Sequence, residues 1–214
     1  MYHYQGLVTG ILAGLAAFFT IRQMQITDAK SEERHLELVE LQTRRDALIV
    51  ERLLVPNYRK LADYLRTLRE VECAQIENID EGLDEEKANT AKEMESIASG
   101  IQGIFEQSSL KEAYELFDGR LKFELESLQA EAYKLLVHAS RAAQEPSIKH
   151  RFGDIRGDKQ VEEAKLKIRR DRAGGWNQSI PYRAAVMRLL EGVLASFDKM
   201  RRTYRLKDVV LLAE

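Results

Sequence analysis

The sequence has few of the residues on which disulfide-stapled or turn-rich domains depend. It contains one cysteine, Cys73, which excludes an internal disulfide, and only three prolines and twelve glycines in 214 residues. Charged residues make up 32% of the chain, compared with about 25% in average globular proteins. This composition favours long, solvated helices over a sheet. The net charge of −2 excludes a protein that is basic overall, and nucleic acid is not an expected partner.

Motifs that carry catalysis are also missing. The paired glycines at 100–103 and 153–157 lack the lysine that follows a phosphate-binding loop. No serine lies in a nucleophile elbow, and a single cysteine cannot supply a cysteine-pair zinc site. Glu32 and His35 share one helix face, but a di-iron bundle requires two such motifs and further glutamates. We therefore expect no catalytic residues, no metal and no cofactor. An enzyme would have to assemble its site from scattered polar residues of the helices.

Residues 2–21 contain no Asp, Glu, Lys or Arg, and Arg22 follows them directly. As a helix rising about 1.5 Å per residue, this stretch is roughly 30 Å long, enough to cross a bilayer. A cleaved signal peptide is the main alternative, but residues 1–5 lack the basic n-region that such peptides require. A helix of a soluble protein would usually carry a polar stripe. We predict a transmembrane anchor over residues 1–21.

Lysine and arginine predict the orientation of this anchor. Arg22, Lys30 and Arg34 follow the segment and none precedes it. Because basic residues favour the cytoplasmic side, the expectation is a single-pass protein of the inner (plasma) membrane, with its N-terminus outside and its body in the cytoplasm. Tyr2 and Tyr4 would then lie at the outer membrane interface.

Small residues recur along the predicted anchor. Gly6, Gly10 and Gly14 are spaced by four, and Ala13 and Ala17 lie beside them on a helix. Such a smooth stripe allows a second helix to approach closely within a membrane. The alternative is that glycine is simply frequent in membrane helices. The stripe predicts association of the anchor with another copy of the chain or with another membrane protein.

The positions of proline and glycine indicate where the remaining helices begin and end. Residues 22–56 are expected to form a helical stalk, packed on the body or paired as a coiled coil, which ends at Pro56. Gly174–Gly175 and Pro181 are expected to separate two later helices. Ser109 resembles the start of a capping box. The predicted helices cover about 58–77, 85–106, 109–144, 159–172 and 179 onward, with a loop at 147–158.

The apolar stripes of these helices can be buried only against one another. No alternating pattern predicts a strand. The expected fold class is all-α, with a single N-terminal transmembrane helix followed by a cytoplasmic antiparallel bundle of four to five helices. The predicted domains are the anchor (1–21), a juxtamembrane helical stalk (22–56) and the bundle (57–214).

Two features of the last third of the chain could contact partners. Trp176, the only tryptophan, lies in a predicted turn at 173–179, where it could form an exposed recognition loop or staple a helix start to the core. Interspersed acids favour an ordinary solvated face for the basic residues of this region, and the alternative is that they bind anionic lipid or an acidic partner. These basic residues are Lys165, Lys167, Arg169, Arg170, Arg172, Arg201, Arg202 and Arg205.

Together these features predict a non-enzymatic, membrane-tethered helical interaction or scaffold protein that self-associates through its anchor. The alternative is a membrane-active effector of the lysis or defence type, whose assembled anchors perturb the bilayer. The lack of charge within the segment counts against a hydrated pore. The expected partners are the lipid bilayer and another copy of the chain or another membrane protein.

Overall fold

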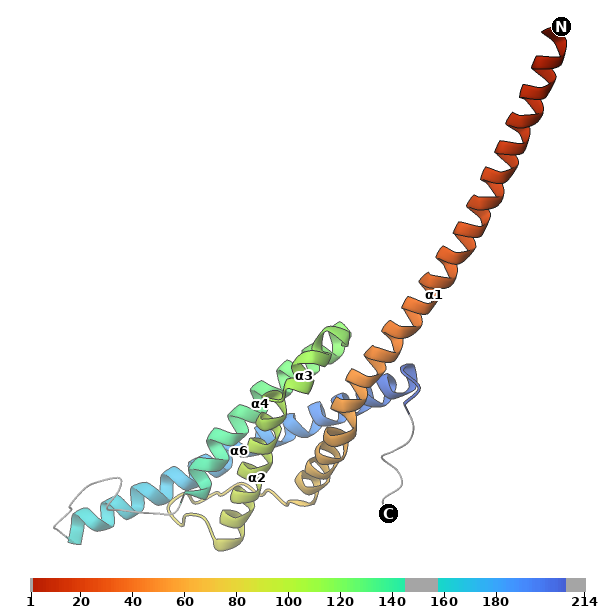
Figure 1. Cartoon of the computed structure of the whole chain (residues 1–214). Coiled ribbons are helices and arrows are strands. Elements are labelled where there is room, and N and C mark those ends of the chain that lie inside the picture. The colour runs from red at the N-terminus through yellow and green to blue at the C-terminus, as the bar shows by residue number, and fades with distance from the viewer. Residues whose placement is uncertain (1, 145–157, 207–214) are drawn as a thin grey trace. The chain divides into compact units, whose positions relative to one another are not determined.

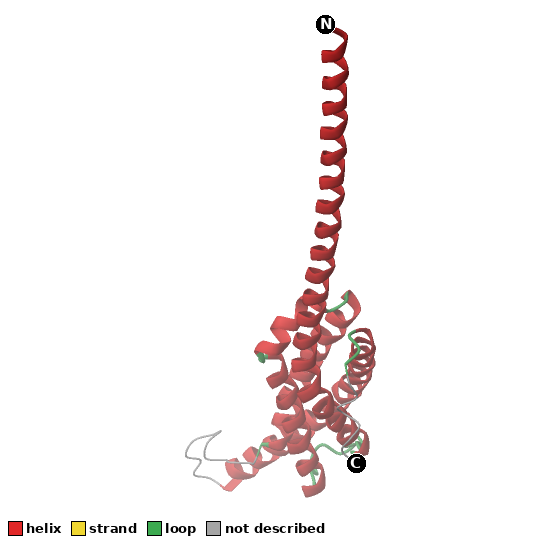
Figure 2. Cartoon of the chain, turned by 45° about the vertical axis from the view of Figure 1, so that its right-hand side comes forward, coloured by secondary structure: helices red, strands yellow, loops and turns green. Residues whose placement is uncertain are grey.

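The computed structural model describes residues 2–144 and 158–206, with side chains for 15–144 and 159–206. Its helices are α1 (Tyr2–Glu70), α2 (Glu85–Phe105), α3 (Ser108–Ala113), α4 (Gly119–Ala143) and α6 (Asp158–Thr203), with a 3₁₀ turn η1 (Tyr114–Leu116) between α3 and α4 (Figure 1). Figure 2 shows no strand in the described residues, so the all-α fold class is confirmed.

The chain divides into two units, Met1–Asp46 and Ala47–Glu214. The described part of the first unit is the N-terminal part of α1, and the second contains the end of α1 and all other described helices. None of the helices, over the residues that the structure describes, is long and apolar enough to span a membrane. The side chains of residues 1–14, which include most of the expected anchor, lie outside the described part.

Hydrogen bonds between helices give their directions within the second unit. Gln102 of α2 donates to the carbonyl of Gln129 in α4 (2.7 Å), and Ser140 further along α4 donates to Glu95 (2.7 Å). Residue numbers fall in one helix as they rise in the other, so the two helices are antiparallel. The same inverse order holds for α4 and α6 in the hydrogen-bonded pairs Glu124–Ser196 and Ala142–Arg172. It also holds for α1 and α2 in the close approach of Tyr64 to Gly100, and in the hydrogen bond between Asn57 and Gln107 just after α2. The antiparallel bundle that the sequence predicted is therefore formed by four helices, namely the C-terminal part of α1 together with α2, α4 and α6. The short helix α3 is a fifth.

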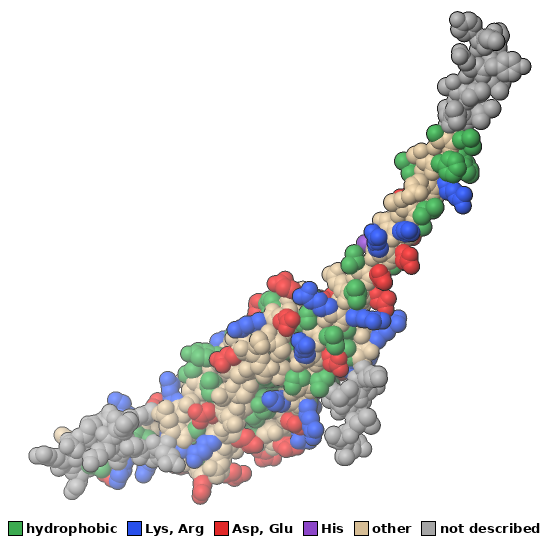
Figure 3. All heavy atoms as spheres, in the orientation of Figure 1, with side chains coloured by type: hydrophobic (Ala, Val, Ile, Leu, Met, Phe, Trp, Pro, Cys, Tyr) green, Lys and Arg blue, Asp and Glu red, His purple; other side chains and the backbone are tan. Residues whose placement is uncertain are grey.

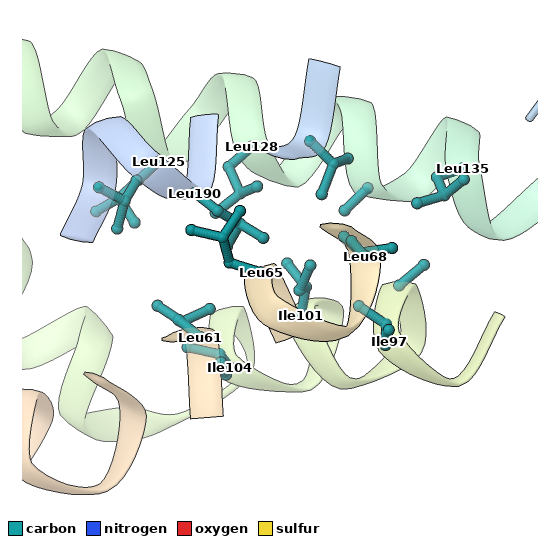
Figure 4. Packing of buried hydrophobic residues seen from close by; sticks show 14 of the residues in the cluster. Leu61, Leu65, Leu68, Ile97, Ile101, Ile104, Leu125, Leu128, Leu135 and Leu190 are labelled. Carbon is teal, nitrogen blue, oxygen red and sulfur yellow. The ribbon is translucent and has the colours of Figure 1, made fainter. Parts of the chain in front are cut away.

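The apolar stripes of these helices form one core. Leu65 and Leu68 from α1 lie near Ile101 of α2 and Leu190 of α6, and all four are buried (Figure 4). Along α4 the residues at intervals of seven from Leu121 to Ala142 are buried, whereas Tyr114, seven residues before Leu121, lies in η1 and is only partly buried. Burying a leucine is worth about 1.5–3 kcal/mol relative to leaving it exposed, so packing of these stripes stabilises the helices.

The prediction that Pro56 ends a helix is wrong, because α1 continues through it to Glu70. A proline within a helix costs about 3 kcal/mol or more, since it removes a backbone donor and crowds the preceding turn. Apolar residues on both sides of it, such as Leu53 and Leu61, are buried in the same core. The fully buried Asn57 donates to the carbonyl of Leu53 and to Gln107 (both 3.0 Å). Burial on both sides offsets the cost of the proline.

The predicted break at Gly174–Gly175 is also wrong, and α6 is one helix that passes through Pro181 as well. A Cβ atom at Gly175 would lie 3.0 Å from the carbonyl oxygen of His138 and 3.1 Å from the amide nitrogen of Ala142. The missing side chain therefore allows the backbone of α4 to approach α6 closely. The glycine serves a helix crossing and does not end the helix.

The helix predicted over 109–144 is interrupted. Phe117 adopts an extended conformation between η1 and α4, and the side chain of Asp118 caps α4 by accepting from the amide of Leu121 (2.8 Å). Ser109 makes no capping bond and instead lies within α3. The helix predicted over 85–106 is confirmed as α2, whereas the one predicted to reach 77 ends at Glu70. The predicted loop at 147–158 lies almost entirely outside the described residues.

Candidate interaction surfaces and a basic pocket

The N-terminal part of α1 exposes large apolar side chains. Phe18, Phe19 and Ile21 are 58%, 63% and 57% exposed, and Leu38 and Leu41 further along are equally accessible. Figure 3 shows several hydrophobic side chains on the surface of this segment. Exposed apolar surface of this kind is typical of sites that contact a membrane or another protein.

The residues predicted to pair the anchors are mostly untested by the structure. The side chains at positions 6, 10, 13 and 14 lie outside the described part of the chain, and these are Gly6, Gly10, Ala13 and Gly14. Ala17, the fifth residue of the stripe, is exposed on α1. The small-residue stripe therefore stays a prediction from the sequence.

Trp176 does not form a recognition loop. The segment around it is helical, and its side chain is fully buried in the middle of α6. Its indole nitrogen donates to the carbonyl oxygen of Ala74 (2.9 Å), while Ser179 donates to the Trp176 carbonyl (2.7 Å). An exposed recognition element is therefore wrong. The interpretation as a staple was right that the residue attaches to the core, although it does so from a helix interior and not from a helix start.

Side chains in the middle of α6 form hydrogen bonds with the backbone of residues 71–84. This segment joins α1 to α2, and we call it the strap. Asn177 pairs with the backbone of Ile76, accepting from its amide (2.8 Å) and donating to its carbonyl (3.0 Å). The guanidinium of Arg183 donates to the carbonyls of Leu68 (Nε, 2.8 Å) and Val71 (Nη2, 2.6 Å). Because the last carbonyls of a helix lack intrahelical donors, Arg183 caps α1 and fixes the start of the strap.

Several of the basic residues singled out in the sequence have partners within the chain. Arg170 forms an ion pair with Asp80 of the strap (2.5 Å), and this hydrogen bond lowers the pKa of the Asp80 carboxyl. The other pairs are Lys165 with Glu162 (2.7 Å), Arg172 with the carbonyl of Ala142 (2.9 Å) and Arg201 with Asp198 (3.6 Å). Lys167, Arg169, Arg202 and Arg205 are exposed. The ion pairs are those of an ordinary solvated face, and contact with lipid or with an acidic partner stays a prediction.

Three of these basic residues line a pocket of about 330 Å³ between the strap and α6, which we call the basic pocket. Lys165, Arg169 and Arg172 follow one another at spacings of four and three, which places them on one helix face. The remaining described lining residues are Glu81, Gly82, Leu83 and Ile168. The carboxylate of Glu81 accepts a hydrogen bond from Asn78 within the strap (2.8 Å). The lining thus carries three positive charges and one negative charge.

Gly82 shapes one wall of this pocket. Its φ of +82° lies in the left-handed region that side-chain-bearing residues rarely adopt, and a Cβ there would lie 3.3 Å from Cγ of Arg169. The turn signal of Asp80, Glu81 and Gly82 was present, but only the tertiary structure brings it next to α6.

An acidic groove lies between the end of α1, the strap and α2. It has a volume of about 440 Å³, and its charged lining residues are Glu70, Glu72, Glu86, Lys87 and Glu93. Within the described residues, no group of three or more His, Cys, Asp and Glu side chains is arranged to hold a metal ion. We assign no binding chemistry to this groove.

His138 lies at the crossing of α4 and α6. Its ring stacks on Tyr182 with centroids 5.1 Å apart, and Nδ1 is buried with no hydrogen-bond partner among the described residues. The Nζ atom of Lys134 lies over the ring of Tyr182, 5.6 Å from its centroid. Burial, together with the positive charge of Arg141, lowers the pKa of His138 from its ordinary value of 6.5. The site therefore favours the neutral imidazole.

This lowered pKa predicts a stability that depends on pH. The unfolded chain binds a proton at His138 near pH 6.5 and the folded chain only at lower pH, so the free energy of unfolding should decrease as the pH falls from about 7 toward 5. His138→Phe keeps a ring against Tyr182 and removes the titration. Urea unfolding at a series of pH values should show a smaller slope in this window for the variant. An identical slope in both proteins would contradict the assignment.

Comparison with known proteins gives no relative. No family model, no curated protein and no solved structure matches this chain. Its class is therefore defined by the architecture of the described residues, an antiparallel bundle formed by four long helices, the first of which, α1, begins in the N-terminal unit.

Proposed function

We propose that this chain is a membrane-tethered helical interaction protein. Residues 1–21 would form the anchor, the glycine stripe would pair anchors, and the bundle would present its charged faces to partners. Support comes from the charge-free stretch that ends at Arg22 and from its continuity with the rest of α1. The bundle has its own hydrophobic core. The role that we propose for it is interaction and not catalysis.

The observation that carries this proposal is the exposed apolar surface at the described end of the anchor. At 100° per residue, the large side chains of Leu15, Phe18, Phe19 and Ile21 cover nearly half of the helix circumference, and two alanines and one threonine lie on the other side. No charged side chain interrupts this surface, which suits burial in hydrocarbon. Transfer of these four side chains from water is worth roughly 1.5–3 kcal/mol each.

The charges after this segment support a cytoplasmic body. Arg22, Lys30 and Arg34 lie within the distance from the membrane at which basic residues favour the cytoplasmic side. The proposal is therefore a single-pass protein of the plasma membrane with the bundle in the cytoplasm.

Membrane extraction tests the anchor. The full chain should stay with membranes after an alkaline carbonate wash, whereas Ile11→Arg combined with Leu12→Arg should release it. Two arginines at the centre of the segment cost roughly 5–7 kcal/mol of insertion free energy. Leu38→Arg combined with Leu41→Arg is the matched control, because these residues are exposed on α1 beyond Arg22, and it should stay with the membranes. Wild-type protein in the soluble fraction would contradict the anchor.

The same detergent extract tests self-association through the glycine stripe. Gly10→Ile combined with Gly14→Ile should reduce the oligomer mass measured by light scattering, because branched side chains keep the helices apart. Leu15→Ile, on the opposite side of the helix, should leave the mass unchanged. An unchanged mass in the glycine variant would remove the role of the stripe. Leakage of dye from vesicles that hold the chain would favour the effector alternative.

A further inference from the structure

We propose that the basic pocket binds a phosphate monoester. It is formed by Lys165, Arg169 and Arg172 of α6 and by the strap residues around Gly82. Three cations on one face of a helix, opposite a turn whose glycine has no side chain, surround a space that suits a doubly charged anion. Neither the anchor nor the association of chains enters this argument.

Arg172 is held in place before any ligand binds. Its Nε donates to the carbonyl of Ala142 in the last turn of α4 (2.9 Å), and the residue is half-buried. A guanidinium carries five N–H donors, so this bond leaves further donors for an oxyanion. The planar group matches the oxygen geometry of phosphate, and a fixed orientation reduces the entropy lost on binding.

Two acidic residues near the pocket already accept hydrogen bonds. Glu81 accepts from Asn78 (2.8 Å) and Glu162 from Lys165 (2.7 Å). The side chains of Lys165 and Glu162 are 43% and 67% exposed, and surface ion pairs of this kind contribute at most about 1 kcal/mol. A dianion can therefore displace Glu162 at little cost. The hydrogen bond from Lys165 lowers the pKa of the Glu162 carboxyl, with a smaller contribution from the charge of Arg169.

The size and the apolar part of the lining indicate an ester and not a large ligand. A volume of about 330 Å³ lies at the lower end of the roughly 300–1,000 Å³ of small-molecule sites. Leu83 and Ile168 supply apolar surface beside the cations, which suits the carbon atoms next to a phosphoryl group. A phosphorylated small molecule and the headgroup of a lipid share this chemistry.

Titration calorimetry on the full chain in an uncharged detergent tests the site, with inorganic phosphate and glycerol 3-phosphate as probes. Saturable binding is expected, and Arg169→Gln should weaken it about tenfold or more, because charge-assisted hydrogen bonds to the anion are lost. Arg169 is exposed, so the variant should keep the helicity of the wild type by circular dichroism. Arg202→Gln, an exposed arginine near the other end of α6, is the matched control and should bind as the wild type does.

The two probes distinguish recognition of a phosphate ester from binding of phosphate alone. Tighter binding of glycerol 3-phosphate supports an ester, either a metabolite or a lipid headgroup. Equal binding of both supports a phosphate site without recognition of the carbon part and overturns the ester assignment. No saturable binding of either probe, or an Arg169→Gln variant that binds as tightly as the wild type, overturns the site. Each of these outcomes is independent of the membrane-extraction result.

Discussion

Replacement of Trp176 by alanine is expected to lower the free energy of unfolding of the bundle by about 3–5 kcal/mol. The side chain is fully buried, and its indole nitrogen donates to the carbonyl of Ala74 in the strap. Truncation would leave a cavity in the core beside α6 and would leave the carbonyl of Ala74 without its donor. Because domains of this size are stable by about 5–15 kcal/mol, this loss is a large share of the total.

Urea unfolding followed by circular dichroism measures the effect, and two further variants separate its causes. Phe123→Ala removes an aromatic side chain that is 69% exposed on α4, and it should change the stability by no more than about 0.5 kcal/mol. Trp176→Phe keeps much of the volume but loses the bond to Ala74, so it should fall between wild type and Trp176→Ala. Equal losses for Trp176→Ala and Phe123→Ala would show that Trp176 is not in the core.

Gly175→Ala is expected to lower the free energy of unfolding by about 1–3 kcal/mol. The new methyl group would press against the carbonyl oxygen of His138 (3.0 Å) and the amide nitrogen of Ala142 (3.1 Å), and backbone atoms cannot turn aside as the end of a side chain can. Two helices would have to separate at their crossing.

Its neighbour provides the control with the same chemical change. A Cβ at Gly174 would meet no atom within 4 Å, so Gly174→Ala should gain up to about 1 kcal/mol from helix propensity alone. Thermal unfolding of the two variants should therefore shift the midpoint in opposite directions. A gain in both would mean that the helices do not cross at Gly175.

Local patterns in the sequence predicted much of the fold. The spacing of Leu121, Leu128 and Leu135 placed the buried face of α4, and the extent of α2 was predicted to within one residue at its end. Amphipathic periodicity reflects residues close in the chain, and it survives in the structure because each stripe is buried against another.

The helix ends that were predicted from proline and glycine were wrong where packing between distant residues outweighs local conformational preference. Pro56 and Pro181 lie inside helices because the residues before and after them belong to one core. Trp176 was placed in a turn because two glycines precede it, yet those glycines lie within α6, one of them at a helix crossing. Nothing in the local sequence distinguishes a glycine that ends a helix from one that admits a neighbouring backbone.

The sequence by itself determined that the chain is helical, that its first segment is free of charge and that the helix faces would have to pack together. Only the tertiary structure decided which basic side chains bind the strap, which of them surround a pocket, and where Trp176 lies. The reason is that periodicity and composition are properties of neighbours in the chain. The basic pocket joins Gly82 to Arg169 and Arg172 across more than eighty residues, and their proximity depends on the packing of every helix between them.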